Sequence, residues 1–319
     1  MSLTPEEIAK AYQKKEVVGW REVIEPGSVA RSHSRLSYLV RSTPPSFNEY
    51  EKYKGTKTML YNVTRKVMGG DLPNTAQAIG DCVSWGAKNA TEYTSCCDIL
   101  IRKEAEKFRP VFAPYYYGTG RVYVGGWLND YGDGSLGSYM AEAVMKYGTL
   151  FSDEPGCPKY SGSVAKEFGA KKATLDLWKP KAIDFPIQDA VLIKTWEELV
   201  CALSNYYAIT TASNVGYEMN ASSDGFFRQT QNWAHQMQFC GFSELQANEP
   251  YAILLNSWGD AHGRLKDFDN KEDLPIGTLR IRRKDVEKHL RANETYVFAN
   301  LKGFPGQKQK IEKELFKLF

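Results

Sequence analysis

One cysteine, one histidine and one asparagine of the sequence stand in surroundings that suit acyl-transfer chemistry. Cys82 lies in the stretch NTAQAIGDCVSWGAKNA, at the head of a segment with helical spacing. His235 lies in NWAHQMQFCGF, where it opens an apolar strand-like run. Asn256 ends the apolar run YAILL and precedes Ser-Trp-Gly. A thiol nucleophile needs a base, and the base needs a third group that orients it.

Two neighbouring strands that end in His235 and Asn256 could bring an imidazole and an amide together. A buried asparagine must find partners for its amide. The Asn256 carbonyl would accept the proton of one ring nitrogen, and the other nitrogen would face the Cys82 thiol. A helix N-terminus and a nearby imidazolium both lower the pKa of a thiol. The alternative interpretation is that Cys82 is a buried, small apolar side chain.

The remaining histidines and cysteines fit structural roles better. His33 lies in a polar stretch, His262 follows GDA in a loop, and His289 lies in RRKDVEKHL, which we interpret as a solvated helix. Asp81 is interpreted as a turn or cap residue, and KDFDNKED (266–273) as a solvated loop rather than a calcium site. We expect the other cysteines to be inert: Cys96, Cys97, Cys157, Cys201 and Cys240.

Helical spacing dominates the first half of the chain. One stripe with steps of three and four begins at Cys82 and carries small residues first, so its first turns can approach another backbone closely. It comprises Cys82, Gly86, Ala90, Tyr93, Cys97 and Leu100. A second helix is predicted from Ser135 to Tyr147 with Gly148 as its stop, and a third opens at the capping box Thr195–Glu198. A helix that begins near Thr4 should end near Val18.

The later part of the chain reads as strands. The runs YYAITTASNV, AHQMQFCGF, PYAILLNSW and GTLRIRR are separated by turns rich in Gly, Asn and Asp. Helices followed by strands predict an α+β protein with two lobes rather than a doubly wound sheet.

Four blocks in this order resemble the papain-like cysteine peptidases. They are QAIGDCVSWGAKNA, DGSLGSYMAEAVMKYG, NWAHQMQFCGF, and YAILLNSWGDAHG followed by GTLRIRR. Together they cover roughly residues 65 to 300. The order Cys, His, Asn with NSWG intact is a specific combination, whereas NSWG alone would be weak.

The resemblance implies a role for each matching residue. Cys82 would be the nucleophile, His235 the base and then the acid, and Asn256 the group that orients His235. Trp258 would shield the His–Asn hydrogen bond from water. Gly134 and Ser135 would line the cleft where a peptide substrate pairs with backbone. The implied fold has a helical lobe that carries the Cys helix and an antiparallel β lobe that carries His and Asn.

Several positions depart from the family pattern. The glutamine that helps to hold the oxyanion normally stands six residues before the nucleophile, but position 76 is Ala and the glutamine is Gln77. The residue after the nucleophile is Val83 rather than Trp, and Ile79 replaces a disulfide cysteine. No long inhibitory propeptide is recognisable in residues 1–60. Such reduced versions resemble bacterial or phage-encoded members.

The resemblance and the order of the predicted elements along the chain give the expected domain organisation. Residues 1–60 are an N-terminal extension, 61–302 a papain-like domain, and 303–319 a C-terminal tail. Within the domain, the helical lobe covers about 65–185 and the β lobe about 186–302.

Composition narrows the function classes. The 319 residues carry a net charge of only +3, too small to indicate nucleic-acid binding. No apolar run is long enough to cross a membrane, and no secretory signal pattern is present. The six cysteines form no C-x-x-C pair, so we expect no metal site and no cofactor. We expect a reducing, cytoplasmic location, or incorporation in a virion if the protein is phage-encoded.

Three functions remain open on the sequence. The first is a cysteine peptidase that cleaves a peptide or isopeptide bond in a peptide or protein substrate. The second is a papain-fold structural or assembly component, for example of a phage particle, with an assembly partner bound through residues 1–60 and the tail 303–319. The third is acyl transfer to an amine instead of water.

Overall fold

The computed structural model describes Glu7, Lys10, Ala11 and the ranges 49–103, 107–126, 132–246 and 249–301. The expected helix from Thr4 to Val18, most of the expected extension 1–60, and the tail 303–319 lie outside the described residues. Within the described ranges, no helix is long and apolar enough to span a membrane.

Helices fill most of the described chain up to residue 182, and two more follow among the strands. Two π-helical segments, η1 and η2, continue α5 and α6. The bounds are α3 Tyr50–Tyr53, α4 Tyr61–Met68, α5 Cys82–Cys97, η1 Asp98–Arg102, α6 Ala113–Gly118, η2 Thr119–Val124, α7 Gly137–Lys146, α8 Gly162–Ala170, α9 Lys172–Ala182, α10 Trp196–Ser204 and α11 Arg283–Leu290.

One antiparallel sheet takes up the second half of the described chain, in the order β2-β7-β3-β4-β5-β6. The short strand β1 pairs with the end of β4. The strands are β1 Lys57–Met59, β2 Ile187–Leu192, β3 Ala208–Tyr217, β4 Gln229–Ser243, β5 Tyr251–Leu255, β6 Thr278–Arg282 and β7 Thr295–Leu301. Each of the four predicted strand runs overlaps one of these strands. The predicted α+β class is therefore confirmed.

Local signals place the three predicted helices correctly. Helix α5 begins at Cys82, as the stripe of small residues predicted. Helix α7 ends at Lys146, and Gly148 follows with a φ of 71°, the left-handed conformation that favours glycine. Thr195 caps α10, and its capping box with Glu198 is complete in both directions.

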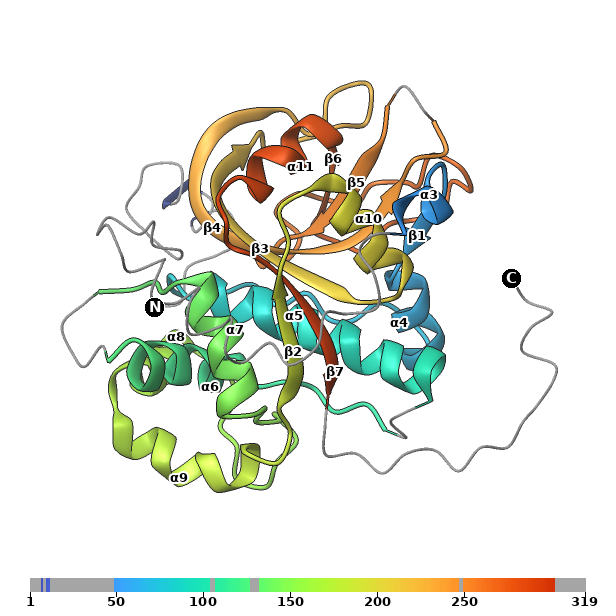
Figure 1. Ribbon diagram of the computed structural model, residues 1–319. Helices are drawn as coiled ribbons and strands as arrows, with labels where there is room; N and C mark the ends of the chain where they lie inside the picture. The colour runs from blue at the N-terminus through green and yellow to red at the C-terminus, as the bar shows by residue number, and fades with distance from the viewer. Residues whose placement is uncertain are drawn as a thin grey trace.

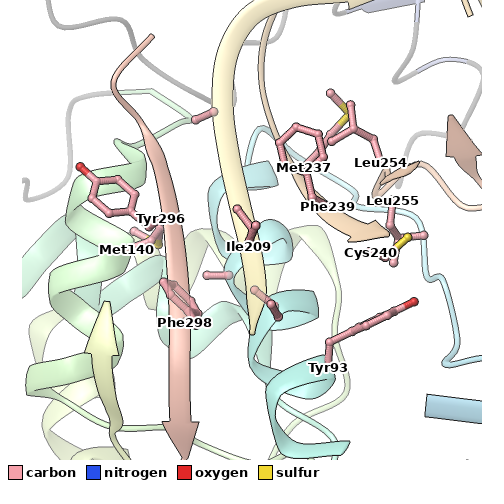
Figure 2. Close-up of a cluster of buried hydrophobic side chains, with 14 of the residues drawn as sticks. Tyr93, Met140, Ile209, Met237, Phe239, Cys240, Leu254, Leu255, Tyr296 and Phe298 are labelled. Carbon is pink, nitrogen blue, oxygen red and sulfur yellow. The ribbon is translucent and has the colours of Figure 1, made fainter. Parts of the chain in front are cut away.

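Helix α5 lies along the border between the helices and the sheet (Figure 1). Helices α6 to α9 gather on one side of it, and the strands curve over the other side. Figure 2 shows Tyr93 of α5 and Ile209 of β3 in this buried layer, together with Met140 of α7 and with Tyr296 and Phe298 of β7. The helix that carries Cys82 is therefore held by the core on both sides.

Two segments differ from their predicted character. Lys57–Met59, within the region expected as an extension, is a strand that pairs with residues Gly241 to Ser243. In the acidic stretch 266–273, Asp267 is buried rather than solvated, because it binds Lys57 Nζ at 2.6 Å and Tyr61 Oη at 3.0 Å.

Candidate active site

The first turn of α5 places the Cys82 thiol directly beside strand β4. Cys82 is the first residue of the helix, and Asp81 precedes it as the N-cap residue. The sulfur accepts a hydrogen bond from the backbone N–H of Gln236 at 3.3 Å. Gln236 follows His235 on β4, so the thiol lies one residue from the candidate base, although 153 positions separate the two in sequence.

Close approach of α5 to β4 depends on glycine at position 86, one turn after Cys82. A Cβ atom at Gly86 would lie 2.8 Å from Cγ of Gln236 and 2.9 Å from Oγ1 of Thr210. Real Cβ atoms do not come this close to their neighbours. The prediction that small residues let the first turns approach another backbone is confirmed.

His235 and Asn256 meet as their sequence surroundings predicted. His235 Nε2 lies 2.7 Å from Asn256 Oδ1, and both residues are buried. Because an amide oxygen can only accept, Nε2 carries the proton. The neutral imidazole therefore has its lone pair on Nδ1, the nitrogen that could take a proton from a thiol.

Trp258 covers the His235–Asn256 pair. Its ring centroid lies 4.8 Å from that of His235, with 37° between the ring planes, and Trp233 lies 4.7 Å beyond it. Both indoles are buried. The expected role of Trp258 in shielding the His235–Asn256 hydrogen bond from water stays a prediction.

Burial controls the charge of His235. It lowers the pKa of the imidazole from 6.5 to about 3, and the hydrogen bond to Asn256 offsets only part of this effect. An imidazolium at this position therefore needs an anion beside it. A thiolate formed by transferring the Cys82 proton to His235 would be such an anion.

Gln77 joins the loop before α5 to the residue after Asn256. Its backbone N–H donates to Ser257 O at 2.9 Å, and Ser257 Oγ donates to Gln77 Oε1 at 2.6 Å. Gln77 Nε2 donates to Ile79 O at 2.8 Å. The structure thus places Gln77 next to Ser257, and its oxyanion role stays a prediction.

Gly134 and Ser135, the residues expected to line the substrate cleft, are both buried. The Gly134 N–H donates to Tyr117 Oη at 3.0 Å, and its carbonyl accepts from Arg121 Nη1. Arg121 also binds Gly132 O at 2.8 Å. The Gly134 N–H is thus bonded within the protein, and the expected pairing of this segment with a substrate backbone stays a prediction.

Asp81 does not cap α5 with its side chain. Its buried carboxyl accepts from Trp85 Nε1 at 3.2 Å and from Tyr160 Oη at 3.1 Å. Burial raises the pKa of this carboxyl from 3.8 to about 8. A neutral acid therefore precedes the thiol, where a carboxylate would disfavour a thiolate.

A cavity of ≈ 360 Å³ lies beside α5. It is lined by Trp85, Lys88 and Glu92 of that helix together with Tyr160, and none of the three candidate catalytic residues lines it. The cavity is therefore separate from the candidate site, although Trp85 and Tyr160 connect it to Asp81.

Two histidines have surroundings that sequence reasoning missed. His289 is fully buried, contrary to the expected solvated helix, because Ser213 Oγ and Tyr217 Oη each lie 2.8 Å from one of its ring nitrogens. Its shared face with Val286 and Leu290 was the available signal. His262 lies 2.8 Å from the amide nitrogen of Asn256, and no spacing rule would have found this loop contact.

No protein-family model matches the chain, and no curated protein matches it significantly.

Comparison by structure finds many similar chains. Xylellain, a cysteine protease from Xylella fastidiosa, is similar over 89% of this chain and 96% of its own, with a TM-score of 0.57 and 12% identity. Digestive procathepsin L 3 from Tenebrio molitor larval midgut is similar over 92% of this chain and 87% of its own, with a TM-score of 0.51 and 14% identity. The proform of the ragweed pollen allergen Amb a 11, a cysteine protease, is similar over 93% of this chain and 77% of its own, with a TM-score of 0.53 and 15% identity. The resemblance inferred from the sequence thus holds for the architecture, and this chain has the papain-like α+β fold.

Proposed function

We propose that this protein is a cysteine peptidase that cleaves a peptide or isopeptide bond through an acyl-enzyme. The observation that carries the proposal is the 2.7 Å contact of His235 Nε2 with Asn256 Oδ1, one residue from the backbone N–H that binds the Cys82 sulfur. In this proposal, Cys82 at the helix start is the nucleophile, His235 the base and Asn256 the orienting amide.

The reaction would proceed in two halves. The Cys82 thiolate attacks the carbonyl carbon, and His235 gives its Nδ1 proton to the leaving amine as the C–N bond breaks. Water then attacks the thioester, His235 takes one of its protons, and Cys82 leaves with the carboxylic acid product released. Asn256 stabilises the imidazolium in both halves and holds the ring in place.

The burial of Cys82 affects how substrate reaches the site. The residue has 0% exposure in this structure. A substrate or probe therefore reaches the sulfur only after surrounding atoms move, and labelling should saturate with probe concentration when that opening limits the rate.

Labelling with a peptide-like, thiol-directed covalent probe tests the proposal. We expect Cys82 to react much faster than Cys157, the least buried of the described cysteines, because burial raises the pKa of the Cys157 thiol to about 11. Replacing His235 with Ala should slow the reaction of Cys82, because the base is lost.

Matched variants make the labelling result decisive. Cys82→Ser should abolish the fast reaction, whereas Cys157→Ser should leave it unchanged. The peptidase proposal fails if Cys82 labels no faster than Cys157 and His235→Ala has no effect. In that case the papain-like fold would serve a non-catalytic role, such as assembly.

A further inference from the structure

The Asn256 side chain makes three hydrogen bonds that depend on which way its amide points. Oδ1 accepts from His235 Nε2 at 2.7 Å and from the backbone N–H of Ser257 at 2.7 Å. On the other side, Nδ2 lies 2.8 Å from His262 Nε2. If the amide were rotated by 180°, its NH₂ group would face two other donors, the N–H of His235 and the backbone N–H of Ser257.

The tautomer of His262 follows from its second contact. His262 Nδ1 lies 3.3 Å from the carbonyl oxygen of Met219, which can only accept. Nδ1 therefore carries the proton, and Nε2 offers a lone pair to the Asn256 amide. Every donor in the chain of contacts from His235 through Asn256 and His262 to Met219 then points the same way, so one proton arrangement satisfies all of them.

The surroundings of His262 keep its ring neutral and in place. The ring lies 5.6 Å from that of Trp258 at an angle of 28°, and 5.8 Å from that of Trp233. The edge of Phe227 closes another side at 5.5 Å. Burial lowers the pKa of His262 to about 4, and the titratable group across Asn256 from it is the buried His235.

We propose that His262 is a positioning residue: its Nε2 holds the Asn256 amide with the carbonyl toward His235 and so keeps the His235 proton on Nε2. The inference rests on the proposed peptidase function for its effect on turnover, but its effect on the His235 tautomer does not need activity. The competing explanation is that the Ser257 N–H orients the amide alone.

Nitrogen NMR of the imidazole rings tests the proposal in the Cys82→Ser variant, which does not need to turn over. We expect His262 to carry its proton on Nδ1 and His235 on Nε2. His262→Leu should convert His235 to a mixture of tautomers, whereas His262→Gln, whose carbonyl can replace Nε2 as an acceptor, should preserve the Nε2–H form. Phe227→Leu, which removes a neighbouring ring and no hydrogen bond, should also preserve it.

Turnover of a peptide substrate gives the second readout. An unsatisfied buried donor in His262→Leu should lower kcat by about 10- to 100-fold with little change in KM. His262→Gln should recover most of this loss, which repacking alone would not do.

The outcomes separate this proposal from the peptidase proposal. A His235 tautomer that is unchanged in His262→Leu, or a His262→Gln variant as impaired as His262→Leu, overturns the positioning role. If His262→Leu does not fold, finding the His262 proton on Nε2 in the Cys82→Ser protein overturns it as well. A wild-type protein that neither labels nor cleaves, with a His235 tautomer that still depends on His262, overturns only the peptidase function.

Discussion

Replacing Asp81 with Asn should remove a loss of stability that the native protein suffers as the pH rises. The Asp81 carboxyl is fully buried between Trp85 and Tyr160, which both donate to it. The folded protein therefore holds it neutral at pH values where the unfolded chain carries a carboxylate. Asparagine has nearly the same shape, and its carbonyl can accept both hydrogen bonds.

The size of the effect follows from the pKa of Asp81. Burial raises it from 3.8 to about 8, and at about 1.4 kcal/mol per unit this corresponds to about 5–6 kcal/mol. Below pH 3.8 the Asp81 carboxyl is protonated in both the folded and the unfolded protein, so it does not change the free energy of unfolding. Between pH 3.8 and 8 only the unfolded state releases it, and the free energy of unfolding falls; above pH 8 the loss is complete.

Urea unfolding at pH 4, 6 and 8 in the Cys82→Ser background measures the effect. The free energy of unfolding of Asp81→Asn, minus that of its parent, should rise by about 5 kcal/mol from pH 4 to pH 8. Subtracting the parent cancels the contribution of Glu294, whose buried carboxyl has its pKa raised to about 7. Asp184→Asn, at an exposed position, should show no such trend.

A difference between Asp81→Asn and its parent that stays constant across this pH range would refute the reasoning. Asp81 would then be ionised in the folded protein, and a negative charge would stand next to the thiol. Infrared spectroscopy gives an independent check, because the parent should show a protonated carboxyl band at pH 6 that the variant lacks.

Three further replacements have definite expected outcomes. Gly86→Ala should lower the free energy of unfolding by about 1–2 kcal/mol in urea, because overpacking against β4 outweighs the helix propensity of alanine; Gly70→Ala, with nothing within 4 Å, should not. Gln77→Ala should lower kcat for a peptide substrate by about 10²–10³-fold if its amide holds the oxyanion, and a smaller loss would remove it from that role. His289→Leu should cost about 2 kcal/mol or more in urea, because the hydroxyls of Ser213 and Tyr217 lose their partner; an unchanged midpoint would contradict this.

Signals that act over a few residues predicted most of the elements that hold the candidate site. A glycine stop predicted the end of α7 and a capping box predicted the start of α10, since each depends on backbone groups within one turn. The start of α5 followed instead from the helical spacing of its residues. Apolar runs separated by turns rich in Gly, Asn and Asp predicted β3 to β6 for the same reason. The His235–Asn256 contact was expected because His235 opens one apolar run and Asn256 ends another, where a buried polar side chain must find a partner.

What the sequence could not predict depends on contacts between distant segments. The three-residue strand β1 is too short to show a pattern. The partners of His262 come from Asn256 and from Met219, 43 positions earlier in the chain. Asp81 looked like a cap because turn residues precede helices, and only the packing of Tyr160 and Trp85 around it makes it a buried acid.

The place of β7 in the sheet has a consequence for how the protein is made. It is the last described strand in sequence, yet it lies between β2 and β3, and pairs with both. During synthesis from the N-terminus, β2 and β3 are therefore made before β7, the strand that lies between them. Glu294, just before β7, is likewise made after Ser138 of α7, from which it accepts a hydrogen bond. Since long-range strand pairing is slow, the sheet behind Cys82 is completed only after nearly all of the described residues have left the ribosome. The proposed peptidase would thus gain its activity only after residues 295–301, which form β7, have been synthesised, so the described residues before β7 emerge from the ribosome before their own active site exists.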